Sequence, residues 1–476
     1  MRDVGARTLE GREVTLKGSE IEALQEGIRG RVITPESSDY DAARRIWNSM
    51  IDRRPALIIR PAGAADILTA VRFARQKGLL TSIRGGGHNI AGTAVCDGGL
   101  MVDLSAMRSV QVDPAARRAT VEAGSTLGDF DREAQAFGLA TPLGINSTTG
   151  VAGLTLGGGG GWLSRRLGLT VDSLLSADVI TADGRLVKAS AQENPDLFWA
   201  IRGGGGNFGI VSRFEFGLHP IGPEVYSGMF VYPLEQGRQV LEGFRDFWAD
   251  APDELTAAPL PRKAPPLPFL PPEVHGRDIL ALLFCYSGDL ARGEALIRPL
   301  GAFGKPYGSL AGPMPYAAWQ QITDPLNPPG ARNYWKSHNI TALSDGLIDT
   351  VLEFSARLPL DQCEIPMLAV GGQVSRLPAD STAYPHRDAQ FLLNIHGRWE
   401  KPEDDQKVIS WARGLWSALE PYSTGTVYVN FMTADEADRV GPAAYGPAAW
   451  KRLTQVKARW DPDNFFRMNQ NIPPAV

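Results

Sequence analysis

The chain has 476 residues, of which 43% are hydrophobic and 21% are charged, with a formal net charge of −5. This length predicts two to three domains of ordinary globular composition, and the charge argues against a nucleic-acid binder, which would present a basic face. Three cysteines without CxxC spacing argue against a disulfide framework, and the absence of a signal segment or a long apolar stretch favours a cytoplasmic protein with no membrane partner.

The first half of the chain predicts a nucleotide-binding domain of α/β or α+β type. It opens with a strand at 56–59, an amphipathic helix at 64–76 and a strand at 79–83 that runs into a glycine cluster. Strands follow at 100–104, 109–113, 118–123, within 171–181 and at 210–218, helices at 126–136 and 194–201, and a Gly/Thr-rich loop at 144–161.

The composition changes after about residue 222, which predicts a second domain. Apolar runs at 226–232, 279–286, 365–370 and 390–395 predict strands, and 234–249 and 291–300 predict helices. The segment 259–272 is rich in proline and predicts an irregular loop. This pattern is typical of an α+β domain with a largely antiparallel sheet.

Three glycine clusters, at 85–87, 157–161 and 203–206, lie within the first domain. Glycine lets a backbone approach a ligand, and successive N–H groups can cradle a pyrophosphate. A single cluster is equally consistent with a tight turn, but three together favour a dinucleotide. No cluster supplies the Gly-Lys-Ser/Thr of a P-loop, and 157–161 follows a loop rather than a strand, which argues against a Rossmann site.

Longer motifs resemble one family. They are IRGGGHNIAGTAVCDGG from residue 83, GVAGLTLGGGGGWLSRRLGL from residue 150, NPDLFWAIRGGGGNFG from residue 194, and YVNF and DPDNFFRMNQNIPP near the C-terminus. Together they resemble the vanillyl-alcohol oxidase/PCMH flavoproteins, and most of all the berberine-bridge-enzyme-like branch, which includes 6-hydroxynicotine oxidase and bacterial secondary-metabolite oxidases. The resemblance is weakest between residues 225 and 380.

The resemblance implies a two-lobed α+β fold. A PCMH-type FAD-binding domain would comprise residues 1–224, with its core at about 54–222, together with 425–476. An antiparallel-sheet substrate domain would comprise 225–424, and a berberine-bridge-like segment would occupy 425–474. A homodimer is one assembly compatible with the sequence, which leaves the oligomeric state open.

The resemblance also implies that FAD is attached covalently through His88. A covalent link retains the flavin and raises its potential as an oxidant; the alternative is a histidine that only hydrogen-bonds a phosphate. Asn146 stands where many relatives carry a second linking cysteine, so a single attachment is expected. The implied cofactor-binding residues are His88, Arg84, Gly85, Gly86, Gly87, Asn89, Thr148, Gly150, Gly153, Gly157, Gly158, Gly205, Asn207, Gly209, Ile210, Asn469 and Gln470.

Four residues are candidates for catalysis by the same resemblance. Tyr428 matches the active-site tyrosine, whose phenolate costs about 3–4 kcal/mol at neutral pH. Asn394 matches a catalytic Glu or Gln but cannot act as a base. His396, on the same face of the strand, would orient substrate or accept a proton, or would only pack. Thr149 matches the position that controls oxygen access; its hydroxyl would hold O2 near the flavin, or the residue would only pack against the ring.

These residues predict an oxidase that takes hydride from an alcohol, sugar, amine or secondary metabolite and passes the electrons to O2, forming H2O2. One alternative is a monooxygenase that uses an oxygenated flavin N5. Another is a non-catalytic flavin carrier. No His/Asp/Glu spacing predicts a metal site.

Overall fold

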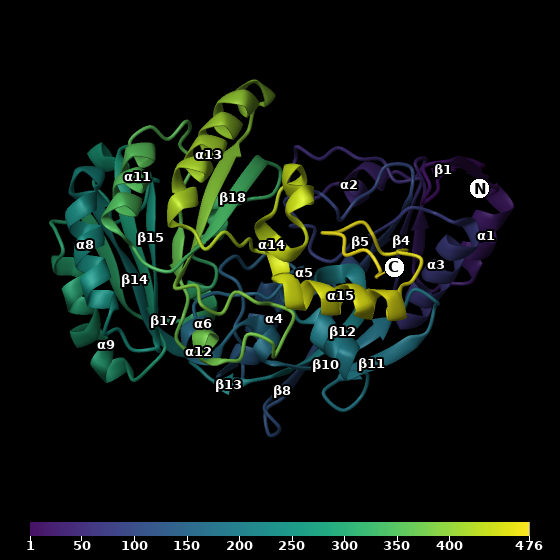
Figure 1. Ribbon diagram of the computed structural model, residues 1–476, viewed down its shortest axis with the longest axis horizontal. Helices are drawn as coiled ribbons and strands as arrows, with labels where there is room; N and C mark the ends of the chain where they lie inside the picture. The colour runs from purple at the N-terminus through teal and green to yellow at the C-terminus, as the bar shows by residue number, and fades with distance from the viewer. Residues whose placement is uncertain (476) are drawn as a thin grey trace.

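The computed structural model describes residues 1–475 and shows two lobes lying side by side (Figure 1). The first lobe contains the purple N-terminal part of the chain and the yellow C-terminal helices, so both chain ends lie in it. The green middle part forms the second lobe. Within residues 1–475, no helix is both long and apolar enough to span a bilayer.

The first lobe contains the predicted strand–helix–strand unit. Strands β4 (Leu57–Arg60), β6 (Leu100–Asp103) and β5 (Thr81–Arg84) are parallel, with β3 (Arg31–Ile33) antiparallel at the edge. Helix α3 (Ala64–Lys77) connects β4 to β5 and ends at Gly78, which adopts a left-handed φ of 62°. The Arg84 end of β5 therefore leads directly into the first glycine cluster.

A second sheet and several short helices complete this lobe. The sheet has the order β11 (Leu186–Ser190), β10 (Leu174–Ile180), β12 (Ile210–Gly217), β8 (Arg118–Glu122), β7 (Val110–Asp113). The short pairs are β1 (Val4–Arg7) with β2 (Glu13–Leu16) and β9 (Leu139–Ala140) with β13 (His219–Pro220). The helices are α1 (Gly18–Glu26), α2 (Tyr40–Arg44), α4 (Leu127–Gln135), α5 (Val151–Leu156), α6 (Ser164–Leu167), α7 (Pro195–Ile201), α14 (Pro442–Tyr445) and α15 (Pro447–Trp460).

The second lobe is an antiparallel sheet covered by helices on one face. Its strands, in spatial order, are β17 (Gly308–Pro315), β14 (Glu224–Pro233), β16 (Asp278–Tyr286), β15 (Leu255–Lys263), then β19 (Met367–Ala369), β20 (Phe391–Trp399) and β18 (Arg332–Ile340). Its helices are α8 (Gly237–Trp248), α9 (Leu290–Ile297), α10 (Tyr316–Trp319), α11 (Asp345–Ser355), α12 (Gln373–Arg376) and α13 (Asp405–Leu419). The α+β prediction is confirmed.

Alternate residues of the second-lobe strands point to opposite faces of the sheet. Leu280, Leu282, Leu393 and Ile395 pack with residues of α8, α11 and α13 in one apolar core. Residues between them face the other way, because successive side chains of a strand point to opposite faces. Part of this second face packs against Trp162, Tyr316 and Trp319 in another apolar cluster, and part of it, including Leu260 and Leu283, lines a cavity.

Two local predictions were wrong. The Pro-rich segment starts as strand β15, which contains Pro259 and Pro261. The Pro261 carbonyl accepts a hydrogen bond from the Ile365 N–H at 3.1 Å, so the main-chain groups of Pro261 face away from β16. The N–H that proline lacks is therefore not needed for the hydrogen bonds between β15 and β16. The predicted loop at 144–161 contains helix α5, whose buried Val151 was hidden among glycines.

Candidate active site

A cavity of about 380 Å³ is lined by both lobes. The first lobe contributes the loop at 85–89 after β5, parts of 144–160 around α5, the stretch 205–211 and the tail at 468–470. The second lobe contributes side chains from β15, β16, β18 and β20. Segments that are far apart in the sequence therefore share one site.

His88 lies in the cavity wall with its ring held from two sides. The Trp47 indole stacks on the imidazole, with centroids 5.0 Å apart and an interplanar angle of 18°. Thr148 Oγ1 lies 3.1 Å from Nε2 and 2.7 Å from Asn146 Oδ1. Burial lowers the pKa of His88 to about 4, so the ring is neutral at pH 7. A neutral, oriented imidazole keeps an electron pair for bonding to carbon.

Glycines leave the first-lobe wall without side chains. A Cβ added to Gly86 would overlap the main chain of Gly150, so these two loops touch backbone to backbone. A Cβ added to Gly153 or Gly206 would meet nothing within 4 Å and would enter the cavity that both residues line. Asn469 adds a buried Oδ1 that has no partner among residues 1–475. A bare wall of main-chain donors with an unpaired amide fits a dinucleotide such as FAD.

Most of the predicted cofactor residues line this cavity. Those that do so are His88, Gly85, Gly86, Gly87, Asn89, Gly150, Gly153, Gly205, Gly209, Ile210, Asn469 and Gln470. Arg84, Thr148, Gly157, Gly158 and Asn207 are outside its wall. The Arg84 guanidinium instead donates to the Ala43 carbonyl at 2.6 Å. Thr148 acts behind the wall, through its contact with His88.

Gly157 and Gly158 leave space that neighbouring side chains occupy. A Cβ on Gly157 would overlap Asn430, and one on Gly158 would press on the ring of Tyr384. Because these glycines lack side chains, Asn430 and Tyr384 can lie close to α5 and the cavity.

Asn207 holds the C-terminal tail. Its Nδ2 donates to the Gln470 carbonyl at 3.0 Å, and its Oδ1 accepts from the Ile472 N–H at 2.9 Å. Lys457 Nζ donates to the Asn207 carbonyl at 2.7 Å and to Asp461 at 2.6 Å, and both of these charged residues are fully buried. The tail is thereby fixed where Asn469 and Gln470 reach the cavity.

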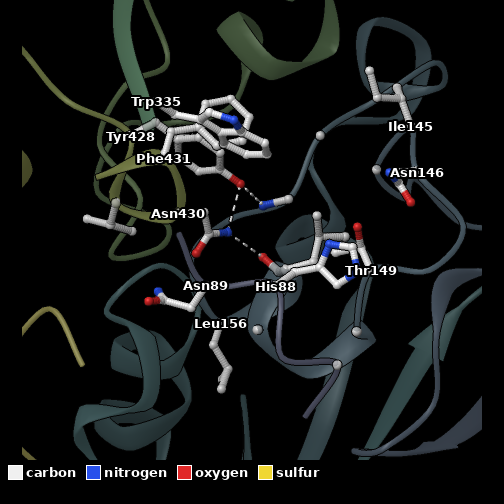
Figure 2. Close-up of a pocket in the computed structure, with 18 of the residues that line it drawn as sticks. His88, Asn89, Ile145, Asn146, Thr149, Leu156, Trp335, Tyr428, Asn430 and Phe431 are labelled. Atoms are coloured by element: carbon white, nitrogen blue, oxygen red, sulfur yellow. Dashed lines mark hydrogen bonds between the residues drawn. The ribbon is translucent and has the colours of Figure 1, made fainter. Parts of the chain in front are cut away.

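Tyr428 presents its hydroxyl at the cavity wall between two donors (Figure 2). The Gly159 N–H and the Asn430 Nδ2 each lie 3.0 Å from this oxygen, and Asn430 also donates to the Leu154 carbonyl at 3.2 Å. Burial raises the pKa of Tyr428, while both donors favour the phenolate and oppose that rise. The arrangement can accept a proton from a bound hydroxyl group.

Thr149 and Asn394 also line the cavity. Thr149 is fixed through its main chain, where its N–H donates to the Asn146 carbonyl at 3.2 Å and its carbonyl accepts from Leu127 at 2.9 Å. Asn394, on β20, is 6% exposed, and its Oδ1 is buried without a partner in the described part of the chain. An unpaired buried amide oxygen is costly unless a ligand satisfies it.

His396 belongs to a buried charged group that the sequence did not reveal. Its Nδ1 lies 3.0 Å from Glu364 Oε1, and Arg262 Nη1 donates to Glu364 Oε2 at 2.7 Å. Burial lowers the pKa of His396, although Glu364 opposes this effect. Burial opposes ionisation of Glu364, but the Arg262 charge and the His396 bond prevail and lower its pKa to about 2. All three residues line the cavity.

Arg262 and Glu364 lie in no motif. They meet His396 because Arg262 pairs with Glu364 and Glu364 pairs with His396 across the sheet. The only sequence signal was a charge within each apolar strand segment. Aromatic side chains also line the cavity: Trp335 packs against His396, and Tyr384 and Phe431 lie beside Tyr428, with Phe431 5.0 Å from the Tyr428 ring between centroids.

Comparisons with known proteins agree with this geometry. Residues 55–190 match the FAD binding domain family, and residues 427–473 match the berberine and berberine-like family. An FAD-linked oxidoreductase of Dictyostelium discoideum is 34% identical, over 94% of this chain and 96% of that protein. (R)-6-hydroxynicotine oxidase of Paenarthrobacter nicotinovorans is 30% identical, over 94% of this chain and 97% of its own.

A solved structure shares the whole architecture. The crystal structure of 6-hydroxy-D-nicotine oxidase from Arthrobacter nicotinovorans superposes with a TM-score of 0.85 at 28% identity, covering 94% of this chain and 98% of that one. The PCMH-type fold and the use of FAD follow from these matches together with the glycine-lined cavity. The chain belongs to the berberine-bridge-like family of FAD-linked oxidoreductases.

Proposed function

We propose that the protein is an oxidase of small organic substrates, with FAD held covalently through His88 alone. The observation that carries the oxidase assignment is the Tyr428 hydroxyl, held in the cavity wall by two hydrogen-bond donors. Bound FAD would supply a hydride acceptor for the substrate carbon and a route for two electrons to O2, with formation of H2O2. The neutral ring of His88, fixed by Trp47 and Thr148, supports the covalent link.

Tyr428 is the proposed general base. As the substrate carbon loses hydride, the substrate hydroxyl or amine loses a proton to Tyr428 Oη. Burial raises the pKa of Tyr428 and so adds to the cost of the phenolate, about 4 kcal/mol for an ordinary tyrosine at pH 7, while the N–H of Gly159 and the amide of Asn430 offset part of it. Asn394 would orient the substrate through its unpaired amide.

A panel of alcohols, sugars and amines tests this proposal. Each compound is mixed anaerobically with the holoenzyme while the flavin absorbance is recorded, and O2 is then admitted. Bleaching by a substrate, followed by one H2O2 per product, supports the oxidase. A flavin that no member of the panel bleaches favours the non-catalytic carrier.

A monooxygenase is the second candidate, because the hydroxyl-bearing Thr149 lies in the cavity wall at the position predicted to control oxygen access. The same experiment separates the two activities when 18O-labelled O2 is used. Label in the organic product supports the monooxygenase, and label in H2O2 alone excludes it.

A further inference from the structure

The second-lobe wall changes character along the direction of its strands. Leu392, Asn394 and His396 all line the cavity from β20, because alternate residues share a face. At about 3.3 Å per residue, the four steps from Leu392 to His396 span roughly 13 Å. The cavity therefore meets an apolar side chain, an amide and an imidazole in succession.

The His396 end of this wall is a charged row. Arg262, Glu364 and His396 are 7%, 8% and 5% exposed, and each is paired with the next across the sheet. Trp335 pairs with His396 on the far side and packs edge-on against its ring, with centroids 4.4 Å apart. Buried charges in an apolar sheet cost stability, so their presence in a cavity wall points to a ligand.

The Leu392 end lies at Tyr428 and is apolar except for Asn339 of β18, which pairs with Leu392 and also lines the cavity. Leu392 pairs with Leu368, which also lines the cavity, and packs against the cluster that contains Tyr384 and Tyr428. Asn394 stands between the two ends. The rings of Trp335 and Phe431 lie between the charged row and the proposed base, with Phe431 5.5 Å from Trp335 and 5.0 Å from Tyr428 between ring centroids.

Arg262 has a hydrogen-bond donor group that is not used within the row. Its Nη1 donates to Glu364 and its Nε donates to the Lys263 carbonyl at 3.1 Å, while Nη2 makes no hydrogen bond within the described chain. Glu364 has both oxygens engaged and balances the charge of Arg262. Arg398, two residues beyond His396, donates to Asn333 at 3.2 Å and does not line the cavity.

We infer that the Arg262–Glu364–His396 row binds a neutral hydrogen-bond-accepting oxygen, a carbonyl or a phenol, at one end of an elongated and otherwise apolar or aromatic substrate. This inference rests on the proposed function, which places the oxidised carbon at Tyr428. Because the negative charge of Glu364 already neutralises the positive charge of Arg262, the row favours a neutral acceptor over a carboxylate. Between the row and Tyr428 the wall presents the side chains of Trp335, Phe431 and Leu392, which favour an aromatic or apolar body over the hydroxyl-rich ring of a sugar.

Two isosteric ligands test the row without turnover. 4-Acetylbiphenyl has a carbonyl oxygen where 4-isopropylbiphenyl has a methyl group, and neither contains an alcohol. Each is titrated into the oxidised holoenzyme, and the shift of the flavin absorption gives the dissociation constant. The ketone should bind about 10- to 100-fold more tightly, as expected for a hydrogen bond from a charged donor.

Arg262→Met should abolish this preference and leave the binding of 4-isopropylbiphenyl within about twofold. Lys263→Met is the matched control: Lys263 is the next residue on β15, is paired with Asp278 at 2.7 Å and does not line the cavity. It should keep the preference. If Arg262→Met does not fold, the double variant Arg262→Met/Glu364→Gln, which removes both charges, is measured instead.

Several outcomes would overturn the inference. They are equal affinity for the two biphenyls, retention of the preference in Arg262→Met, tighter binding of biphenyl-4-carboxylate than of the ketone, preferential binding of cellobiose, and no flavin shift with either biphenyl. Failure of the oxidase proposal looks different: alcohols would leave the flavin unbleached while the ketone preference persists.

Discussion

The first-lobe wall of the cavity is made of main chain, whereas the second-lobe wall is made of side chains at alternating strand positions. Gly86 touches Gly150 through the backbone, and Gly153 and Gly206 leave open space above the first wall. Across the cavity, Asn394 and His396 project from β20. The first wall suits a cofactor of constant shape, and the second can change its ligand by single substitutions. Retention of the cofactor and choice of substrate are thus separable properties.

The largest expected effect is on the first wall. His88→Ala should abolish covalent flavin, because it removes the only predicted attachment. Acid precipitation followed by in-gel flavin fluorescence measures this directly. Asn146→Ala is the control and should remain fluorescent. Covalent flavin in the His88 variant would refute the attachment site.

The next effect concerns the base. Tyr428→Phe should slow anaerobic flavin bleaching by about 10²- to 10⁴-fold, because it removes the proton acceptor. Ligand affinity of the oxidised enzyme should change little. Tyr422→Phe, at a tyrosine outside the cavity wall, should behave as wild type. An unchanged bleaching rate in Tyr428→Phe would move the base elsewhere on the second wall, with His396 the next candidate.

A pH titration of stability isolates the charged row. The pKa of Glu364 is lowered from 4.5 to about 2 in the folded protein, so its contribution is complete above pH 4.5 and is lost as pH falls through about 2. A shift of this size corresponds to about 3 kcal/mol. Glu364→Gln should therefore reduce the unfolding free energy at pH 7, and the difference from wild type should shrink below pH 4.5.

The control for this titration is Glu353→Gln, at an exposed residue on α11 that forms an ion pair with Arg357. Its unfolding curve should follow wild type across the range. Parallel curves for wild type and Glu364→Gln between pH 2 and pH 5 would contradict the assignment of an ionised, buried Glu364.

The smallest effect compares two glycines of the first wall. Gly86→Ala should destabilise the fold by about 1–3 kcal/mol, because its Cβ would overlap Gly150. Gly206→Ala, with open space above it, should leave the melting temperature of the flavin-free protein unchanged but lower the fraction of the protein that acquires flavin. Equal melting temperatures for the two flavin-free variants would show that the two loops are not in close contact.

The two walls also differ in how far they could be predicted. His88 and the glycines of the first wall lie in contiguous runs, so the local motif indicated where the cavity would be. Arg262 and Glu364 are 102 residues apart, and Glu364 and His396 are 32 apart. The register of the strands brings these residues together, and that register cannot be predicted from composition or from spacing along the sequence. Pro259 and Pro261 concealed β15 for a related reason, since only the pairing direction shows that their missing N–H groups are not needed.

The contact between Asn207 and Ile472 has a consequence for synthesis of the chain. The two residues are 265 positions apart, and the whole second lobe is made between them. At about 5–20 residues per second, the ribosome needs roughly 15–50 s to cover that interval. Throughout it, the nascent first lobe lacks the tail that completes its cavity, and we expect the flavin to encounter an open cleft during this period.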